Sequence, residues 1–575
     1  VYHGTDSDCG TEAYKYLIDG VKNGAISEKQ IDISLKRLFT VRFKLGMFDP
    51  VGKSKYDAIG LDTLNAKSHQ KLALQMARQS IVLLKNEHSL LPLSTSLKSI
   101  TVIGPNADNK LAVLGNYNGV PAVTKTPLGG IVDMLGSNKV YYEKGINYTD
   151  NLVALPFDVT GKFNIEGHPG FEAQYFNNSD FKGDAVYKEY EADIDHSWAA
   201  GAAVVPGIKA TGFAVKWNTT FTPDSTGTYN IKISGRDYYR LSIDGSEKIA
   251  DWRMHGQTSM NYSQDCIAGK TYHITLEYAQ SNVGNRLAAI KFVIGKIHQS
   301  TVAEIAARAA KSDVIVYVGG ISPELEGEEM PVSLPGFSGG DRTSINLPEI
   351  QTELLKALKN TGKPVVFVIM TGSAIAMEWE NTNIPAIVNA WYDGQSAGTA
   401  IADVLFGRYN PSGHLPVTFY KNNADLPPFD DYSMAKRTYK YFTGSPAYPF
   451  GYGLSYTSFM YQWKQLPKQV YHSSDNIKCS VIIENKGKMD GDDVPQAYIS
   501  FPNTNYRLPI KQLCNFKRLA IKQKHSKLFE IAIPVSSLMK WNKSANKLQP
   551  IKGTYKITVG QNSRDAKLVR SFKIE

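Results

Sequence analysis

The fold is decided by the stretch Val314-Ile-Val-Tyr-Val-Gly-Gly-Ile-Ser-Pro-Glu-Leu-Glu-Gly-Glu-Glu-Met330. Its first five residues are apolar and mostly β-branched, which is typical of a strand buried on both faces of a parallel sheet. Two glycines end the strand, and four glutamates then follow within six positions, at 324, 326, 328 and 329. Loops at the carboxyl ends of such strands are where ligands bind in open α/β sheets. The pattern therefore predicts an acidic loop at the ligand-binding edge of a sheet.

The chemistry of this acidic loop is ambiguous from composition alone. Carboxylates that crowd together repel one another, and the repulsion raises the pKa of some of them, as a general acid near neutral pH requires. Gly340-Asp341-Arg342 follows closely, and its guanidinium could instead hold one carboxylate ionised. An acidic loop is more often simply solvated, and the spacing does not match an EF-hand calcium loop. The four glutamates by themselves do not identify a catalytic site.

Residues on both sides of this stretch continue an α/β pattern. Apolar strand-like runs and helical periodicities alternate there, as parallel sheets with crossover helices require. The expected strands are Ile81–Leu84, Ile100–Gly104, Val365–Ile369 and Ile387–Trp391, and the expected helices are Val302–Lys311, Pro348–Asn360 and 397–406.

Two other regions are expected to be all-β. Residues 167–296 show short alternating runs separated by Gly, Asp and Ser turns, and residues 455–575 show a similar pattern. Each is long enough for a β-sandwich. The first one interrupts the α/β pattern, so we expect an inserted sandwich in one α/β domain.

The chain opens with a pattern of two helices. Tyr14 to Val21 has helical spacing, and Ser27 with Gln30 predicts a cap for a second helix that ends near Gly46. Two helices of this length cannot form a core alone, so we expect a packing partner elsewhere.

Bulk composition excludes several classes of protein. The 575 residues carry a formal net charge of +10 and are 42% hydrophobic. No apolar run is long enough for a membrane span, and no basic stripe with stacking aromatics indicates nucleic-acid binding. The four cysteines lack metal-ligand spacing, so no metal or cofactor is expected, and a Cys479–Cys514 disulfide stays open.

The chain resembles glycoside hydrolase family 3 over essentially its whole length. The motifs that carry the resemblance are Gly4-Thr-Asp-Ser-Asp-Cys-Gly10, Ala77-Arg-Gln-Ser-Ile-Val-Leu-Leu-Lys-Asn86, Val102-Ile-Gly-Pro-Asn-Ala107, Gly340-Asp-Arg-Thr343 and Gly451-Tyr-Gly-Leu-Ser-Tyr456. The tail from Val494 resembles the family's fibronectin type III-like domain, and the inserted sandwich is similar to the lectin-like domain named after anthrax protective antigen.

This resemblance implies a multidomain fold of α/β and all-β parts. Residues 1–50 would be the last helices of a (β/α)₈ barrel that this chain lacks otherwise, and 51–75 a linker. The α/β-sandwich domain would comprise 76–166 and 297–424, with the lectin-like β-sandwich inserted at 167–296. A connection at 425–454 would lead to the fibronectin type III-like β-sandwich at 455–575.

The resemblance also implies a retaining glycosidase mechanism with two carboxylates. Glu328 matches the family's acid/base best and Glu326 is the alternative, because the loop before Asp341 is longer than usual. Asp341 and Arg342 are expected to order the loop. The family's nucleophile, an Asp in a Ser-Asp motif, should lie before Gly4, so none is expected in this chain and the chain alone should be inactive.

Substrate and location follow from the same resemblance. We expect an oligosaccharide or aryl-glycoside substrate, with a β-xylosidase favoured, a β-glucosidase second and an α-L-arabinofuranosidase also within range. Export to the periplasm or medium is expected from the family. The alternative is a non-catalytic carbohydrate-binding protein, in which Trp252, Tyr238 and Tyr239 could stack on sugars, although core packing is the more frequent role of such residues.

Overall fold

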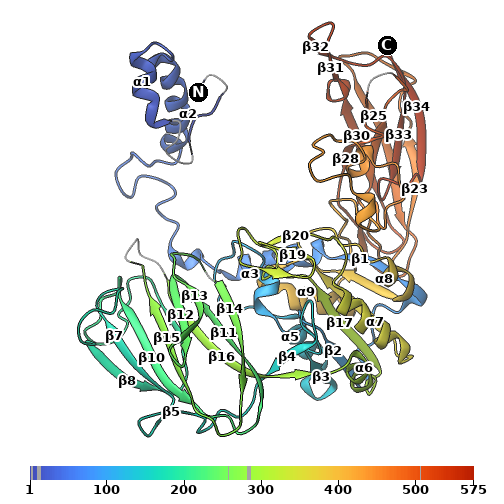
Figure 1. Ribbon diagram of the computed structural model, residues 1–575. Coiled ribbons are helices and arrows are strands. Elements are labelled where there is room, and N and C mark those ends of the chain that lie inside the picture. Colours follow the sequence, from blue (N-terminus) through green and yellow to red (C-terminus); the bar gives the residue numbers. More distant parts are fainter. Residues whose placement is uncertain (2–3, 9–13, 257, 282–286, 505–506) are drawn as a thin grey trace. The chain divides into compact units, whose positions relative to one another are not determined.

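A computed structural model describes residues 1, 4–8, 14–256, 258–281, 287–504 and 507–575 (Figure 1). The chain forms two compact units, Val1–Ala73 and Leu74–Glu575. Each unit is described by itself. None of the helices in the described part of the chain has the length and apolar character needed to span a bilayer.

The first unit contains the two predicted helices. They are α1 (Leu17–Lys22) and α2 (Glu28–Lys44), and Ser27 caps α2 as predicted by accepting a hydrogen bond from the backbone N–H of Gln30 at 3.3 Å. Of the described residues in this unit, Ser34 alone is buried. Apolar side chains of α2 such as Leu35 and Phe43 remain exposed, so the described residues of this unit do not form a hydrophobic core of their own. Residues 9 and 10 of the predicted 4–10 motif, including Cys9, lie outside the described residues.

The second unit is built on a sheet with strand order β1-β22-β21-β17-β2-β3. All its neighbours are parallel except β1, which runs antiparallel to β22. The strands are β1 (Val82–Asn86), β2 (Ile100–Ile103), β3 (Val140–Glu143), β17 (Val314–Gly320), β21 (Val365–Met370) and β22 (Ala386–Asn389). The predicted strands are thus confirmed, and β17 lies in the middle of the sheet.

Helices cover both faces of this sheet. Along β17, Val314, Val316 and Val318 pack into one core with α5 and α9, whereas Ile315 and Tyr317 pack into the other with α6 and α7. This two-sided burial explains why the strand is apolar at every position. The helices are α3 (Lys67–Ser80), α4 (Lys110–Leu114), α5 (Pro127–Leu135), α6 (Val302–Ala309), α7 (Glu349–Asn360), α8 (Glu378–Asn383) and α9 (Ala397–Leu405).

Strands β4 to β16 form the predicted β-sandwich between the two halves of the α/β sequence (Figure 1). One sheet contains β13-β12-β15-β10-β5-β6 with β7 and β8, and the other contains β14-β11-β16-β4 with β9. Residues of both sheets share one core around Trp217 and Tyr229. The longer strands are β10 (Ala214–Phe221), β11 (Gly227–Gly235), β12 (Tyr238–Ile243), β14 (Thr258–Cys266), β15 (Tyr272–Ala279) and β16 (Ala288–Gln299).

The sandwich begins earlier in the sequence than its alternating pattern indicates. The short strands β4 (Leu152–Leu155) and β5 (Phe163–Ile165) precede residue 167, and β4 pairs with the end of β16. Strands of three or four residues carry too little alternation to be recognised in sequence. The other strands are β6 (His168–Pro169), β7 (Phe171–Phe176), β8 (Tyr187–Glu191), β9 (Asp195–Trp198) and β13 (Ser246–Asp251).

The C-terminal region is a second sandwich. Its two main sheets have the orders β23-β25-β30 and β24-β34-β33-β27-β28, and they enclose a core that includes Tyr555 and Phe572. Cys479 and Cys514 are free, so the disulfide left open by the sequence is absent. The main strands are β23 (Phe459–Gln465), β24 (Val470–Tyr471), β25 (Asn476–Asn485), β27 (Gln496–Ser500), β28 (Gln512–Phe516), β30 (Ser526–Pro534), β33 (Gly553–Gly560) and β34 (Leu568–Ile574).

One buried side chain fixes the point at which β17 ends. The Gln351 side chain, fully buried on α7, accepts a hydrogen bond from the Gly320 N–H at 2.8 Å and donates to the Gly320 carbonyl at 2.7 Å. It also donates to the Tyr148 carbonyl at 3.0 Å and accepts from the Tyr317 hydroxyl at 3.0 Å. A single amide thus ties a helix, a strand end and a neighbouring loop together.

Gln351→Leu is expected to destabilise the α/β region by at least about 3 kcal/mol, because it leaves several buried polar groups unpaired at about 1–3 kcal/mol each. Hydrogen exchange of β17 and β21 measures the change. Glu353→Gln, at an exposed position of the same helix, is the control and should stay within about 0.5 kcal/mol. Equal effects of the two substitutions would contradict the role of Gln351.

Candidate active site

The acidic loop leaves the sheet after Gly319 and Gly320, the last two residues of β17, as the sequence predicts. Gly320 has φ of +107°, and a Cβ there would lie 2.1 Å from the Met370 carbonyl oxygen, so only glycine fits. The buried Asn106 side chain, after β2, donates to the carbonyls of Gly319 at 3.1 Å and Ile321 at 3.0 Å. The first residues of the loop are therefore held by neighbouring loops at the carboxyl edge of the sheet.

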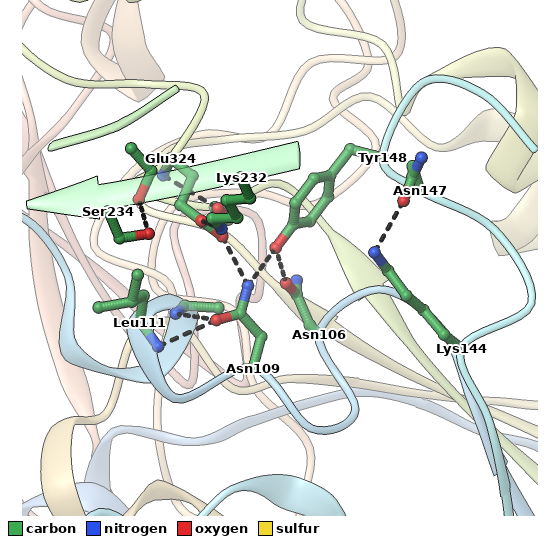
Figure 2. A network of polar contacts seen from close by, with 12 residues as sticks. Asn106, Asn109, Leu111, Lys144, Asn147, Tyr148, Lys232, Ser234 and Glu324 are labelled. Carbon is green, nitrogen blue, oxygen red and sulfur yellow. Dashed lines mark hydrogen bonds and ion pairs between the residues drawn. The ribbon is translucent and has the colours of Figure 1, made fainter. Parts of the chain in front are cut away.

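Glu324 is the most strongly held of the four glutamates. One carboxylate oxygen accepts from the Asn109 amide at 2.7 Å, and the other pairs with the Lys232 ammonium at 3.0 Å (Figure 2). Burial opposes ionisation of Glu324, but Lys232, Asn109 and Lys144 outweigh it, so its pKa lies below the usual value. A carboxylate held ionised in this way is unsuited to act as a general acid.

Glu326 is held by a second set of donors. Its carboxylate accepts from the Tyr392 hydroxyl at 2.8 Å and from the Gly372 N–H at 3.2 Å. Burial raises the pKa of Tyr392 and the Glu326 charge raises it further, so the phenol keeps its proton and remains a donor. Glu326 also lies close enough to Arg342 to favour the charged guanidinium. Glu326 thus joins the acidic loop to the loops after β21 and β22.

Glu328 differs from both because its side chain is exposed. Its carboxylate accepts a hydrogen bond from the Tyr117 hydroxyl. Tyr117 is itself 86% exposed, and it lies in the loop after α4. Glu328 is therefore a loop carboxylate that a substrate in solvent can reach.

The extra length between Glu328 and Asp341 forms a small antiparallel sheet. It consists of β18 (Ser333–Leu334), β19 (Phe337–Ser338) and β20 (Asp341–Arg342). Gly340 folds this sheet back onto the acidic loop, because a Cβ at Gly340 would lie 1.8 Å from the Gly327 carbonyl oxygen. The insertion is thus accommodated without opening the loop.

Asp341 and Arg342 have different surroundings in this small sheet. Arg342 donates to the Ser344 carbonyl at 3.2 Å, the Ser373 hydroxyl at 2.9 Å and the Ala374 carbonyl at 2.8 Å. Burial lowers the pKa of Arg342, an effect that Glu326 partly offsets. The Asp341 side chain is exposed. Arg342 therefore links the loop before α7 to the loop after β21, whereas Asp341 faces solvent.

Sequence reasoning missed Tyr117 and Tyr392, which contact the two candidate glutamates. Tyr117 has φ of +53°, and Trp391, the residue before Tyr392, has φ of +48°. Glu329, next to Glu328, has φ of +50°. A non-glycine residue in this region costs about 1–3 kcal/mol and is often found at functional sites. Neither tyrosine is near the acidic loop in sequence, so no local signal could have found it.

The aromatic residues proposed for sugar stacking are mostly packed. Tyr239 is fully buried in the sandwich core, and Tyr238 packs against a small cluster with Phe176. Trp252 is 39% exposed, but the Arg240 guanidinium lies 4.5 Å from the centre of its ring. Core packing, the more frequent role of such residues, is confirmed for Tyr239.

Two hollows lie away from the acidic loop, one in the inserted sandwich and a smaller one beside β3 and α6. A hollow of about 510 Å³ at one end of the inserted sandwich is lined by residues such as Asp244, Lys248 and Lys270, and it contains no residue of the loop. Among the described residues, no group of His, Cys, Asp and Glu side chains could hold a metal ion.

This arrangement matches a known family. Residues 81–456 match the glycosyl hydrolase family 3 C-terminal domain. The chain belongs to glycosyl hydrolase family 3. Residues 493–563 match the fibronectin type III-like domain, so the predicted multidomain α/β fold with an all-β C-terminal domain is confirmed.

Relatives of this family 3 chain are β-xylosidases and β-glucosidases. It is 36% identical to a xylan 1,4-β-xylosidase of Xylanibacter ruminicola over 99% of the chain and 65% of the relative. It is 27% identical to a periplasmic β-glucosidase of Salmonella typhimurium over 98% of the chain and 58% of the relative. The chain thus spans about two thirds of the length of these relatives or less.

A solved structure confirms the fold. The β-glucosidase from Kluyveromyces marxianus in complex with glucose superimposes with a TM-score of 0.74. The match covers 100% of this chain and 70% of that chain, at 24% sequence identity.

The loop that carries Tyr392 also contains a partly buried acid, Asp393. Burial raises the pKa of Asp393 to about 8, and its carboxyl accepts a hydrogen bond from the Ser80 hydroxyl at 2.7 Å. The other carboxyl oxygen is buried without a partner. Asp393 is therefore protonated at neutral pH.

Asp393→Asn is expected to be more stable than the native chain at pH 8, with the difference shrinking towards pH 4. The folded state binds this proton more tightly than the unfolded state, so native stability falls between about pH 4 and 8. The fall is at most about 1.4 kcal/mol per pH unit, and asparagine has no proton to lose. Calorimetry across this pH range measures the difference, with Asp133→Asn as the exposed control. A difference that does not change with pH would show that Asp393 does not titrate as described.

Proposed function

We propose that this chain carries the acid/base loop of a retaining exo-β-glycosidase, with Glu328 as the acid/base. The observation that carries the proposal is the contrast among the glutamates of one loop. Glu324 and Glu326 each accept hydrogen bonds from donors that hold them in place, whereas Glu328 is exposed. An acid/base must reach the glycosidic oxygen and exchange a proton with it, and later with water. Glu328 meets this requirement better than Glu326.

Two neighbours support Glu328 in this role. The Tyr117 hydroxyl donates a hydrogen bond to the Glu328 carboxylate, which orients this carboxylate. Arg342 joins the segments on which the loop rests, in agreement with a loop-ordering role for it. Asp341, which is exposed, would contribute through the backbone of the small sheet.

The proposed substrate is a terminal β-linked xylose of a plant-type oligosaccharide, or an aryl xyloside. The 36% identity to a xylan 1,4-β-xylosidase supports xylose, and β-glucosidase relatives make glucose the second choice. The periplasmic relative supports a location outside the cytoplasm. We further propose that residues 1–50 are the last helices of a barrel. Residues 167–296 would be a lectin-like insert, to which the preceding strands β4 and β5 also belong.

The proposal assigns no nucleophile to this chain. A retaining mechanism needs a second carboxylate about 5–5.5 Å from the acid/base, and the family resemblance places it before Gly4. Without it, general-acid help alone would leave only about 10²–10⁴-fold acceleration. We therefore expect the chain alone to be inactive, and a version extended at its N-terminus with native sequence to be active.

The experiment measures hydrolysis of p-nitrophenyl β-D-xyloside and β-D-glucoside by the chain and by the extended version. Only the extended version should cleave, with the xyloside preferred. Cleavage by the chain alone would mean that it holds a nucleophile, and binding of sugars without cleavage by either version would favour the carbohydrate-binding alternative.

In the extended version, Glu328→Gln should lower kcat by about 10²–10⁴-fold on substrates with poor leaving groups. Azide should restore turnover of p-nitrophenyl xyloside by Glu328→Ala and give a β-xylosyl azide, because azide needs no general base. Glu329→Gln, at the exposed neighbour, is the control and should retain activity. If azide instead rescues Glu326→Ala and not Glu328→Ala, Glu326 is the acid/base.

A further inference from the structure

The Glu324 side chain connects the α/β domain to the inserted sandwich through an ion pair. It belongs to the acidic loop at the edge of the α/β sheet, whereas its partner Lys232 belongs to β11 of the inserted sandwich (Figure 2). The two residues are 92 positions apart in sequence. Their side chains are only 24% and 35% exposed, so the ion pair is largely shielded from water.

The strand geometry of β11 directs Lys232 towards the acidic loop. Ile231 and Ile233 are buried in the sandwich core, and side chains alternate between the two faces of a strand. Lys232 must therefore leave the opposite face of the sheet, where it meets Glu324. Because both neighbours are in the core, the backbone of Lys232 is fixed, and with it the point from which the lysine reaches the loop.

On the other side, Glu324 is connected to the α/β domain by a chain of partly or fully buried polar groups. Asn109 donates to Glu324 at 2.7 Å and to the Tyr148 hydroxyl at 3.0 Å, and Tyr148 donates to Asn106 at 2.7 Å. Asn106 in turn holds the carbonyls of Gly319 and Ile321, where the acidic loop begins. The network thus runs from the inserted sandwich to the base of the loop.

Two ammonium groups lie near Glu324. One is Lys232 and the other is the partly buried Lys144; burial lowers the pKa of Lys144, the charge of Lys232 lowers it further, and the charges of Glu324 and Asp150 oppose both effects. Lys144 donates to Asn147 at 2.7 Å (Figure 2). Removing Lys232 would leave Glu324 without its direct counter-ion, and a shielded carboxylate that loses its partner tends to move towards water.

We propose that Lys232 is a positioning residue for the acidic loop: the inserted sandwich holds residues 321–330 in place through the Lys232–Glu324 pair. The sandwich then supports the acidic loop structurally, in addition to any sugar binding of its own. That this also sets the position of Glu328 rests on the function proposed above, because Glu328 lies four residues after Glu324 on the same loop.

The first test uses the chain as it is and needs no activity. Hydrogen exchange is measured for peptides that cover 321–330 and for β10 and β15 of the sandwich. Lys232→Met should speed exchange in the loop by about tenfold or more while β10 and β15 keep their protection. Lys232→Arg keeps the charge and should stay near the native rate.

Lys162→Met is the matched control. Lys162 also lies in the inserted sandwich and pairs with a carboxylate, Asp224 at 2.9 Å, a residue outside the acidic loop. Exchange in 321–330 should stay at the native rate in this variant. Equal loop exchange in Lys232→Met and the native chain, or an effect of Lys232→Met confined to the sandwich, would overturn the proposal.

The second test uses the N-terminally extended version and compares two kinds of substrate. In the step that forms the glycosyl-enzyme, a displaced acid/base matters only where the leaving group needs a proton, so Lys232→Met should lower kcat/KM at least about tenfold more on xylobiose than on p-nitrophenyl xyloside. Lys232→Arg should restore the native ratio. A purely structural defect would lower both rates together and would argue against positioning.

The outcomes separate this proposal from the proposed function. Faster loop exchange in Lys232→Met, together with an extended version that cleaves no glycoside, would refute the glycosidase and leave the link between sandwich and loop standing. If the extended version cleaves glycosides but loop exchange in Lys232→Met stays at the native rate, the glycosidase stands and the link between sandwich and loop is refuted.

Discussion

Compensation of negative charge is the constraint on which the candidate site depends. Four glutamates within six residues would repel one another in an unsupported loop, and each needs its own environment to be accommodated. The structure gives Glu324 an ammonium and an amide, and it gives Glu326 a phenol, a backbone N–H and a nearby guanidinium. The first two carboxylates are satisfied by protein donors, whereas Glu328 and Glu329 are exposed to solvent. The difference in exposure among identical side chains thus arises from their partners.

The parallel sheet supplies the fixed frame for this arrangement. β17 lies between β2 and β21, so the loops that follow these strands meet at one edge of the sheet. Asn106 comes from the loop after β2 and Gly372 from the loop after β21, and both contact the acidic loop. Gln351 fixes the strand end itself from the adjacent helix. The site is therefore built from short loops on a buried and rigid sheet, an arrangement that favours accurate placement of reacting groups.

The inserted sandwich gives this member of glycosyl hydrolase family 3 a further connection to the loop. An inserted domain is usually free to move when only its two linking segments join it to the host. Here the last residues of β16 pair with β4, and a lysine of β11 binds the loop directly. The small sheet β18–β20 makes a further contact with the loop, because the lack of a side chain at Gly340 lets this sheet pack against Gly327. The acidic loop is thus confined by elements from widely separated parts of the chain.

Much of the fold could be predicted from the sequence because its determinants are local. The apolar run of β17, the cap at Ser27 and the alternation in β11 each indicate their structure within a few residues. The family motifs likewise pointed to the acidic loop and to Glu328 and Glu326 as its candidates. The boundaries of the sandwich were less certain, since β4 and β5 are too short to show a period.

The sequence alone determined the order of the domains, the position of the acidic loop after a buried strand, and the family. Only the tertiary structure decided which partner each of Glu324, Glu326 and Glu328 has, because Lys232, Tyr392 and Tyr117 lie far from the loop in sequence. The order of apolar and polar residues reports local burial and periodicity. Which side chains pair across a fold depends on the packing of distant segments, and that information becomes visible only when the chain has folded.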